Sequence, residues 1–460
     1  MTSAIPCPTF RDPSGSLRLE GDLAIREIHT SAREEVLEFV TSPFCHRLQE
    51  RGDLVAATID DAPGGLRLLH PRVAVPTYPW EWTPSMWLAA AELTLSLCEE
   101  ALSEGWILKD ATPLNVLFVG PRPVLVDILS FERRNPGSSL WLAYGQYVRT
   151  FELPLLMNRL LHWPLELSFF KRDGYEPTDL HQSLSLTQRF SPAAFWSITL
   201  PALFERRKGN AAPTPTPAKA KDPGLALHVL KRMLASLRKR TRKALPKHSG
   251  SEWADYTGTL THYTPEQSAQ KLEWMQQVLN ELHPESVLDI GANTGEFSAL
   301  AAGMGAQVVA LERDAAAAER LYCTSRAKNL SIQTIHTDAA RPTPAAGWNN
   351  NETSALLPRL EDRFDLVLML AVIHHLLLLE QIPLVSIVEL CHRLTRSYLV
   401  IEWVPATDPM YQSLMRGRDT LYGSITEADL LAACVKRFQL LRQLTLSNGR
   451  ILFLFERNRE

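Results

Sequence analysis

Strand-like and helix-like patterns of hydrophobic residues alternate along the chain from residue 286 onward. Short apolar runs predict strands, and the segments between them show helical periodicity. Such alternation predicts right-handed crossovers and a parallel sheet with helices on both faces. The predicted strands are SVLDI (286–290), QVVALE (307–312), SIQTIH (331–336), FDLVLML (364–370) and SYLVIEW (397–403), and the helices are EFSALAAGM (296–304), AAAAERLYCTSRA (315–327) and PLVSIVELCHRL (383–394).

The last part of the chain has a different pattern. Two apolar runs, QLLRQLTL and ILFLFER, flank the turn SNGR at residues 447–450. Asn-Gly between two apolar runs is a strong hairpin signal. We therefore predict an α/β fold in which a Rossmann-like, seven-stranded sheet ends in an antiparallel hairpin.

A change of composition separates two halves of the chain. Residues 209–224, GNAAPTPTPAKAKDPG, alternate proline with small residues, as extended linkers do. The sequence predicts a domain at 1–208, a Pro/Ala-rich linker with a basic amphipathic helix at 209–250, and a second domain at 251–460.

The segment 225–247 carries leucines at helical spacing beside many cations and no acid. Its basic residues can form the solvated face of a connecting helix that docks on a neighbouring domain. The same residues could contact an anionic membrane or another polyanion. The leucines are Leu227, Leu230, Leu234 and Leu237, and the cations are Lys231, Arg232, Arg238, Lys239, Arg240, Arg242 and Lys243.

Bulk composition is that of an ordinary globular protein. The 460 residues are 45% hydrophobic and 22% charged, with a formal net charge of −3. The six cysteines are scattered, without C-x-x-C or histidines at metal-ligand spacing, so we expect free thiols and no metal site. Neither a signal peptide nor a spanning segment is expected, which favours a cytoplasmic location.

The stretch VLDIGANTGEFS, residues 287–298, is an apolar strand that ends on an acid and runs into a glycine turn. A dinucleotide site would need G-x-G-x-x-G, which lets pyrophosphate reach a helix N-terminus. Residues 291–296 read G-A-N-T-G-E, so the last glycine is missing and Glu296 opens the helix. A carboxylate at that place repels phosphate and favours a neutral or cationic ligand.

This turn resembles the first motif of the class I S-adenosylmethionine-dependent methyltransferases, and the resemblance covers about residues 260–460. In that family an acid ends the strand and a G-x-G-x-G turn follows; Asp289, Gly291, Asn293 and Gly295 match these positions. Asn293 replaces the middle glycine, and asparagine tolerates left-handed backbone better than other non-glycine residues. The resemblance implies S-adenosylmethionine as the cofactor.

The next two strands also end in acids. The resemblance implies that Glu312 accepts hydrogen bonds from the ribose hydroxyls and that Asp338 and Ala339 contact the adenine edge. A lone acid at a strand end is more often a helix cap, but three in register make coincidence improbable. Tyr263, before the first strand, could cover the cofactor or could anchor a surface loop.

The fourth strand runs into AVIHHL, which places His374 and His375 at its carboxyl end, where open α/β sheets bind ligands. Either could accept a proton from the methyl acceptor, or could merely satisfy local backbone. The Asn/Asp-Pro-Pro-Tyr signature of many nucleic-acid and amide methyltransferases is missing, so no specific nucleic-acid partner is expected. The chain as a whole resembles a group of bacterial methyltransferases linked to nodulation, which implies a small-molecule or glycan acceptor.

The N-terminal half carries a second resemblance, in residues 105–131. Asp110, Asn115 and Asp127, spaced around the strands VLFV and VLVD, look like the catalytic and metal-binding loops of protein kinases and small-molecule phosphotransferases. Leu108 replaces the usual histidine, and Lys109 is the first lysine of the chain. We therefore expect a mainly helical α+β, kinase-like domain that has lost phosphoryl transfer. The alternatives are a bifunctional kinase–methyltransferase and a non-catalytic, cofactor-binding regulator.

Overall fold

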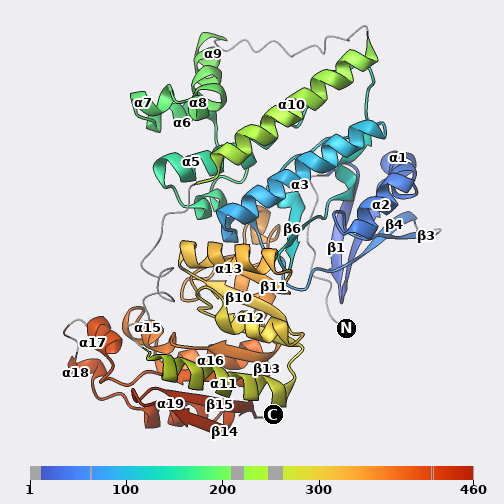
Figure 1. Cartoon of the computed structure of the whole chain (residues 1–460). Coiled ribbons are helices and arrows are strands. Elements are labelled where there is room, and N and C mark those ends of the chain that lie inside the picture. Colours follow the sequence, from blue (N-terminus) through green and yellow to red (C-terminus); the bar gives the residue numbers. More distant parts are fainter. Residues whose placement is uncertain are drawn as a thin grey trace. The chain divides into compact units, whose positions relative to one another are not determined.

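The chain folds into two compact units in the computed structural model (Figure 1). The structure describes residues 12–62, 65–208, 222–246, 263–415, 417 and 419–458. The first unit comprises Met1–His248 with Ala346–Thr353, and the second comprises Ser249–Ala345 with Ser354–Glu460. The Pro/Ala-rich linker expected before α10 lies almost wholly outside the described residues.

The first unit combines small antiparallel sheets with helices. Its strands are β1 (Gly15–Glu20), β2 (Leu23–Ile28), β3 (Thr58–Ala62), β4 (Gly65–Pro71), β5 (Trp106–Leu108), β6 (Val116–Val119), β7 (Arg122–Leu125) and β8 (Phe131–Arg133). Its α-helices are α1 (Arg33–Val40), α2 (Pro43–Arg51), α3 (Pro84–Ser103), α4 (Tyr144–Tyr147), α5 (Leu153–Leu161), α6 (Pro177–Ser183), α7 (Leu186–Arg189), α8 (Pro192–Ala194), α9 (Leu200–Lys208) and α10 (Pro223–Ala244). Short 3-10 or π turns are η1 (Thr30–Ala32), η2 (Pro79–Glu81), η3 (Pro113–Asn115), η4 (Ile128–Ser130), η5 (Val148–Glu152), η6 (Leu165–Phe169), η7 (Phe195–Thr199) and η8 (Trp348–Asn350).

Within the described part of this unit, a four-stranded sheet has the order β1-β2-β4-β3, and α3 is the central helix. Thr83 caps α3 by accepting a hydrogen bond from the Met86 amide, and Pro84 occupies the first turn. Most apolar side chains of α3 are buried, because other elements cover it on several sides. The sequence prediction of an α+β unit agrees with this arrangement.

The basic helix α10 packs on α3 within this unit. Leu230, Leu234 and Leu237 are buried, as their spacing predicted. Several cations on its other faces pair with carboxylates of the unit, which fits the prediction of a docked connecting helix. The ion pairs are Arg238–Glu99 (2.8 Å), Arg240–Glu152 (2.9 Å) and Arg242–Glu92.

The second unit contains the alternating strands and helices. Its strands are β9 (Ser286–Ile290), β10 (Gln307–Glu312), β11 (Ile332–His336), β12 (Phe364–Met369), β13 (Thr395–Trp403), β14 (Phe438–Thr445) and β15 (Ile451–Arg457). Its helices are α11 (Pro265–Leu282), α12 (Glu296–Gly303), α13 (Ala315–Ala327), α14 (Leu356–Leu360), α15 (Ile373–Leu378), α16 (Leu384–Leu394), α17 (Pro409–Met415), α18 (Asp419–Tyr422) and α19 (Glu427–Cys434).

The strands of the described second unit form one seven-stranded sheet in the order β11-β10-β9-β12-β13-β15-β14. The first five strands are parallel, and β15 pairs antiparallel with both β13 and β14. The predicted sheet and terminal hairpin are therefore confirmed. The chain runs outward from β9 to β11 and then returns to β12, so the order reverses between β9 and β12. Open α/β sheets bind ligands at such a switch point.

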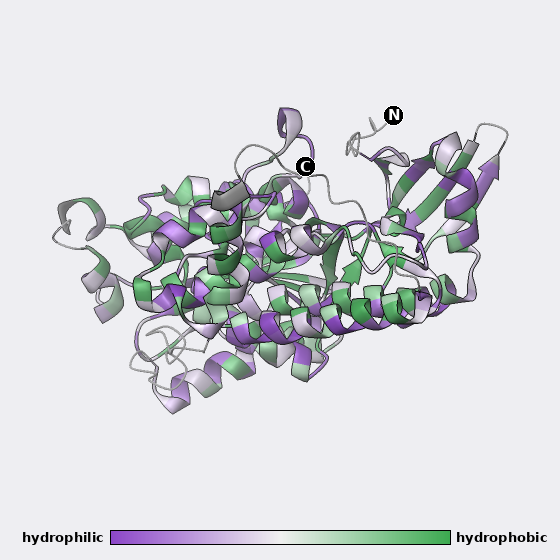
Figure 2. Ribbon diagram, turned by 90° about the horizontal axis from the view of Figure 1, so that it is seen from above, coloured by the Kyte–Doolittle hydropathy of each residue, from purple (hydrophilic) through white to green (hydrophobic). Residues whose placement is uncertain are grey.

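Both faces of this sheet are covered. Successive residues of β9, from Val287 to Ile290, are all buried, and so is most of β12. One face meets Trp274, Met275 and Val278 of α11. A strand covered on both sides reads as a continuous apolar run rather than as an alternation. The helices differ from these strands, because they carry both hydrophilic and hydrophobic residues (Figure 2).

Candidate active site

The turn after β9 adopts the left-handed backbone that its sequence predicts. Gly291, Asn293 and Gly295 have φ values of 74°, 52° and 86°. A Cβ on Gly291 would stand 2.3 Å from Cγ2 of Val372, and one on Gly295 would stand 2.1 Å from Cδ1 of Leu321. Both glycines are thus required by close packing as well as by φ.

Glu312 at the end of β10 ties this turn to the next loop. Its Oε2 accepts a hydrogen bond from the Asn293 amide (2.6 Å), and its Oε1 accepts one from the Asp314 amide (2.7 Å). Burial raises the pKa of Glu312, while these two amides oppose the rise. The carboxylate is held at the edge of the sheet in a fixed orientation.

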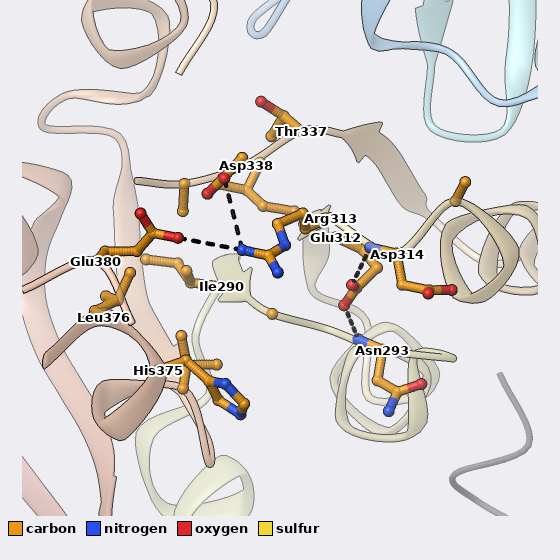
Figure 3. Close-up of a pocket in the computed structure, with 15 residues that line it drawn as sticks. Ile290, Asn293, Glu312, Arg313, Asp314, Thr337, Asp338, His375, Leu376 and Glu380 are labelled. Atoms are coloured by element: carbon orange, nitrogen blue, oxygen red, sulfur yellow. Dashed lines mark hydrogen bonds and ion pairs between the residues drawn. The ribbon is translucent and has the colours of Figure 1, made fainter. Parts of the chain in front are cut away.

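A cavity of about 310 Å³ opens at the carboxyl ends of β9, β10, β11 and β12 (Figure 3). Five of the predicted cofactor residues line it, together with His375. The lining also includes residues that the sequence did not single out, among them Arg313, Asp314, Val372 and Glu380. The five predicted residues are Gly291, Asn293, Glu312, Asp338 and Ala339.

Asp289, another predicted residue, lies beneath the turn and is not in the cavity lining. Its side chain is buried, and its Oδ2 accepts a hydrogen bond from Ser298 Oγ at 2.6 Å. Burial raises the pKa of Asp289 to about 6. The hydrogen bond from the Ser298 hydroxyl lowers this pKa, and the negative charge of Glu312 raises it further. Asp289 therefore loses its proton near pH 6, which places a negative charge near the carboxyl end of β9.

The two histidines at the start of α15 differ in position. His375 lines the cavity, whereas His374 is buried and does not. Burial, followed by the charges of Arg313 and Arg450, lowers the pKa of His375 to about 4. The His375 ring is therefore neutral at physiological pH.

Tyr263 belongs to a buried polar cluster and not to the cavity lining. Its hydroxyl donates a hydrogen bond to Glu402 and accepts one from Arg450 Nη1 (2.6 Å). Lys271 Nζ lies 2.6 Å from Glu402 Oε2, and Arg450 Nε lies 2.8 Å from Asp408 Oδ2. Glu402 lies one residue before the end of β13, so this cluster joins α11 to β13.

The polar segment 341–354 follows β11 and precedes β12 in the chain. Ala346–Thr353 groups with the first unit, and the cavity lining contains none of residues 341–354. A short bridge between Ala346 and Thr353 closes this segment on itself.

The N-terminal residues resembling a kinase loop come together in the first unit. Asn115 Nδ2 lies 3.4 Å from Asp127 Oδ2 and 3.0 Å from Ser130 Oγ. Burial and the neighbouring Asp127 raise the pKa of Asp110. Among the described residues, no group of three or more His, Cys, Asp or Glu side chains is arranged to hold a metal ion.

An arginine that the sequence did not single out completes this N-terminal cluster. Arg26 of β2 is 4% exposed, and its Nη1 lies 3.1 Å from Asp127 Oδ1. Arg26 Nη2 also lies 3.4 Å from the Val126 carbonyl oxygen. A buried guanidinium therefore neutralises the Asp127 carboxylate.

Comparisons with known proteins agree with the geometry of the second unit. Residues 230–382 match the family model described as "Methyltransferase domain". The C-terminal part of the chain is therefore similar to methyltransferases, and S-adenosylmethionine is the cofactor that this similarity supports.

The chain is also similar along its whole length to one curated protein. It is 28% identical over 480 residues to nodulation protein NoeA of Rhizobium meliloti (strain 1021), covering 100% of this chain and 98% of that one. Among solved structures, it is similar to N-methyltransferase NodS from Bradyrhizobium japonicum WM9, with 12% identity, a TM-score of 0.32, and coverage of 42% of this chain and 98% of that one. It is similar to PH0226 protein from Pyrococcus horikoshii OT3, with 13% identity, a TM-score of 0.33, and coverage of 46% and 100%.

The cavity residues fit an adenosyl sulfonium compound. Asn293 Oδ1 is buried in the turn without a partner among the described residues, so it can accept a hydrogen bond from a ligand. Glu312 brings a carboxylate to the cavity lining, whereas Asp338 and Glu380 are paired with Arg313. When bound, S-adenosylmethionine supplies an activated methyl group on its sulfonium.

The raised pKa of Asp289 predicts a pH-dependent affinity for the cationic cofactor. As pH rises through about 6, Asp289 becomes charged and attracts the sulfonium. A bound cation that lowers this pKa by one unit gains about tenfold in affinity above that pH. Calorimetry between pH of about 5 and 7.5 should show this gain for S-adenosylmethionine and a smaller one for neutral S-adenosylhomocysteine. The Asp289→Asn variant should lose the difference; an unchanged pH profile in that variant would assign the effect to another group.

Proposed function

We propose that this protein transfers the methyl group of S-adenosylmethionine to an oxygen or nitrogen nucleophile of a small molecule or glycan. The observation that carries the proposal is the cavity at the switch point of the sheet, where Glu312 is fixed by the amides of Asn293 and Asp314. In this proposal Glu312 accepts hydrogen bonds from the ribose hydroxyls, and Asp338 and Ala339 meet the adenine edge. Gly291 and Asn293 lie beside the methionine part.

His375, rather than His374, is the better candidate to face the acceptor, because it lines the cavity. Its neutral ring can accept a hydrogen bond from an acceptor hydroxyl or amine and orient the lone pair toward the methyl carbon. Its lowered pKa makes it a weak base. The main contribution of the protein is then alignment of the two reactants and exclusion of water.

The experiment that tests the proposal uses S-adenosylmethionine with a labelled methyl group. The purified full-length protein is incubated with this donor and with fractionated metabolites and glycans, and mass spectrometry identifies what gains label. Since the full-length relative is named a nodulation protein, fractions from nodulating bacteria come first. Label in a small molecule or glycan, lost in the Glu312→Ala variant, is the expected result. Label in nucleic acid or protein alone would contradict the assigned acceptor class.

For the first unit, we propose a kinase-like domain that does not transfer phosphoryl groups. The support is the ion pair of Arg26 with Asp127, which places a fixed cation where the resemblance implies a metal. Calorimetry of the full chain with magnesium and ATP should show no binding. ATP binding that disappears in Asp127→Ala, but persists in the surface variant Asp61→Ala, would favour the bifunctional alternative.

The contact of α10 with an anionic membrane or polyanion stays a weaker proposal. Arg238, Arg240 and Arg242 are engaged by carboxylates of the same unit. Arg232 and Lys239 are exposed and would carry such a contact. No helix within the described ranges is both long enough and apolar enough to span a bilayer.

A further inference from the structure

Two acids, Asp338 and Glu380, pair with two arginines at the end of the cavity that the proposed function assigns to adenine. Arg313 follows Glu312 directly, and its Nη1 lies 3.4 Å from Glu380 Oε1 and 3.7 Å from Asp338 Oδ2 (Figure 3). Arg341 Nη1 lies 3.0 Å from Asp338 Oδ2 and 3.2 Å from Glu380 Oε1. Three loops, which follow β10, β11 and α15, are thus joined through these side chains.

Glu380 differs from the arginines in how firmly it is placed. Its side chain is 12% exposed, whereas those of Arg313 and Arg341 are 60% and 68% exposed. Its backbone amide donates a hydrogen bond to the His375 carbonyl (3.3 Å), which fixes it at the end of α15. Glu380 is therefore the buried member of the group, and the arginine side chains are the exposed ones.

The proposed function requires this arrangement to change when adenine binds. Arg313 shares Asp338, the carboxylate that the proposed function assigns to the adenine edge. Once Asp338 turns to the adenine amino group, Glu380 still holds the Arg313 guanidinium in the cavity wall. A planar guanidinium held beside an aromatic ring can stack on its face, which a flexible lysine does less well.

We propose that Glu380 is a positioning residue that holds Arg313 against the face of the cofactor's adenine ring. The proposal rests on the proposed function, since it needs the adenosyl group in this cavity. Glu380 acts through Arg313 and does not touch the reacting atoms. Because stacking concerns the neutral base, it affects the methylated and demethylated cofactor equally.

The test measures, by calorimetry, the affinities of the full chain for S-adenosylmethionine and S-adenosylhomocysteine. Glu380→Gln keeps the side-chain shape and removes the charge. It should weaken both ligands about three- to tenfold, the range expected for a stacked cation. Arg313→Met should cause a similar loss, and the double variant should bind no worse than Arg313→Met alone. Glu389→Gln, which removes an ion pair with Arg437 elsewhere in the unit, is the matched control and should leave both affinities unchanged.

Other outcomes would overturn the proposal. A loss confined to S-adenosylmethionine would mean that Glu380 merely attracts the sulfonium through space. Full additivity of the two substitutions would mean that Glu380 does not act through Arg313. Arg313→Lys keeps the charge but not the planar group, so undiminished binding by this variant would exclude stacking even if Glu380→Gln failed to fold. Wild-type protein that binds neither ligand would refute the proposed function itself, whereas normal binding by both wild type and Glu380→Gln refutes this inference alone.

Discussion

Replacement of Glu312 by alanine is expected to weaken S-adenosylmethionine binding by about a hundredfold or more. Hydrogen bonds to a charged group contribute about 1.5–3 kcal/mol each, and the proposal gives Glu312 two of them to ribose. The loss of affinity has a second cause, because the same carboxylate accepts hydrogen bonds from the backbone amides of Asn293 and Asp314. Without this carboxylate, the glycine turn after β9 is no longer linked by hydrogen bonds to the loop after β10. Calorimetry with S-adenosylhomocysteine, which also carries the ribose, should show the same loss.

The isosteric variant Glu312→Gln separates charge from shape. Its amide oxygen can accept from one backbone N–H, but its NH2 group then faces the other N–H donor. We expect an affinity between those of wild type and Glu312→Ala. Glu361→Ala, which removes a surface ion pair with Arg393, is the control for loss of a carboxylate in the same unit. Affinity within about twofold of wild type in a folded Glu312→Ala protein would remove this residue from the site.

The sheet of the second unit could be predicted because its strands are buried on both faces. Apolar runs such as Val287–Ile290 cannot be solvent-exposed loops, and the helices between them keep a clear period. The terminal hairpin followed from Asn448-Gly449, although the turn is longer than two residues: the Leu446 amide bonds to the Arg450 carbonyl, and Gly449 has a φ of 82°. The local sequence pattern was therefore sufficient to predict these strands and the hairpin.

The sequence did not predict the contacts that join distant segments. Arg313 and Glu380 are 67 residues apart, and Arg26 and Asp127 are far apart as well. Charged residues at strand ends are common, so nothing in the local pattern says which pairs will meet. Tyr263 illustrates the same limit: its position before the first strand suggested a cover over the cofactor, while its hydroxyl lies between Glu402 and Arg450.

The buried charge cluster around Glu402 leads to the largest stability effect that we expect. Glu402 is fully buried and is paired with Lys271 (2.6 Å) and Arg450 (3.5 Å). Burial alone would raise the pKa of Glu402, but these two cations outweigh it, so the pKa lies below its usual value. The ionised carboxylate therefore stabilises the folded state above the unfolded-state pKa, and this contribution is lost as pH falls through the folded-state pKa.

Glu402→Gln should lower the free energy of unfolding by about 3–5 kcal/mol, because it leaves buried cations without their carboxylate. Denaturant unfolding of the full chain near neutral pH measures the change. The double variant Glu402→Gln/Lys271→Met removes one charge of each sign and should recover much of the stability, since a neutral pair of similar volume is tolerated where a lone buried charge is not. If Glu402 instead contacted the methyl acceptor, the double variant would regain stability without regaining turnover. Stable Glu402→Gln protein with reduced turnover would likewise assign Glu402 to the acceptor site.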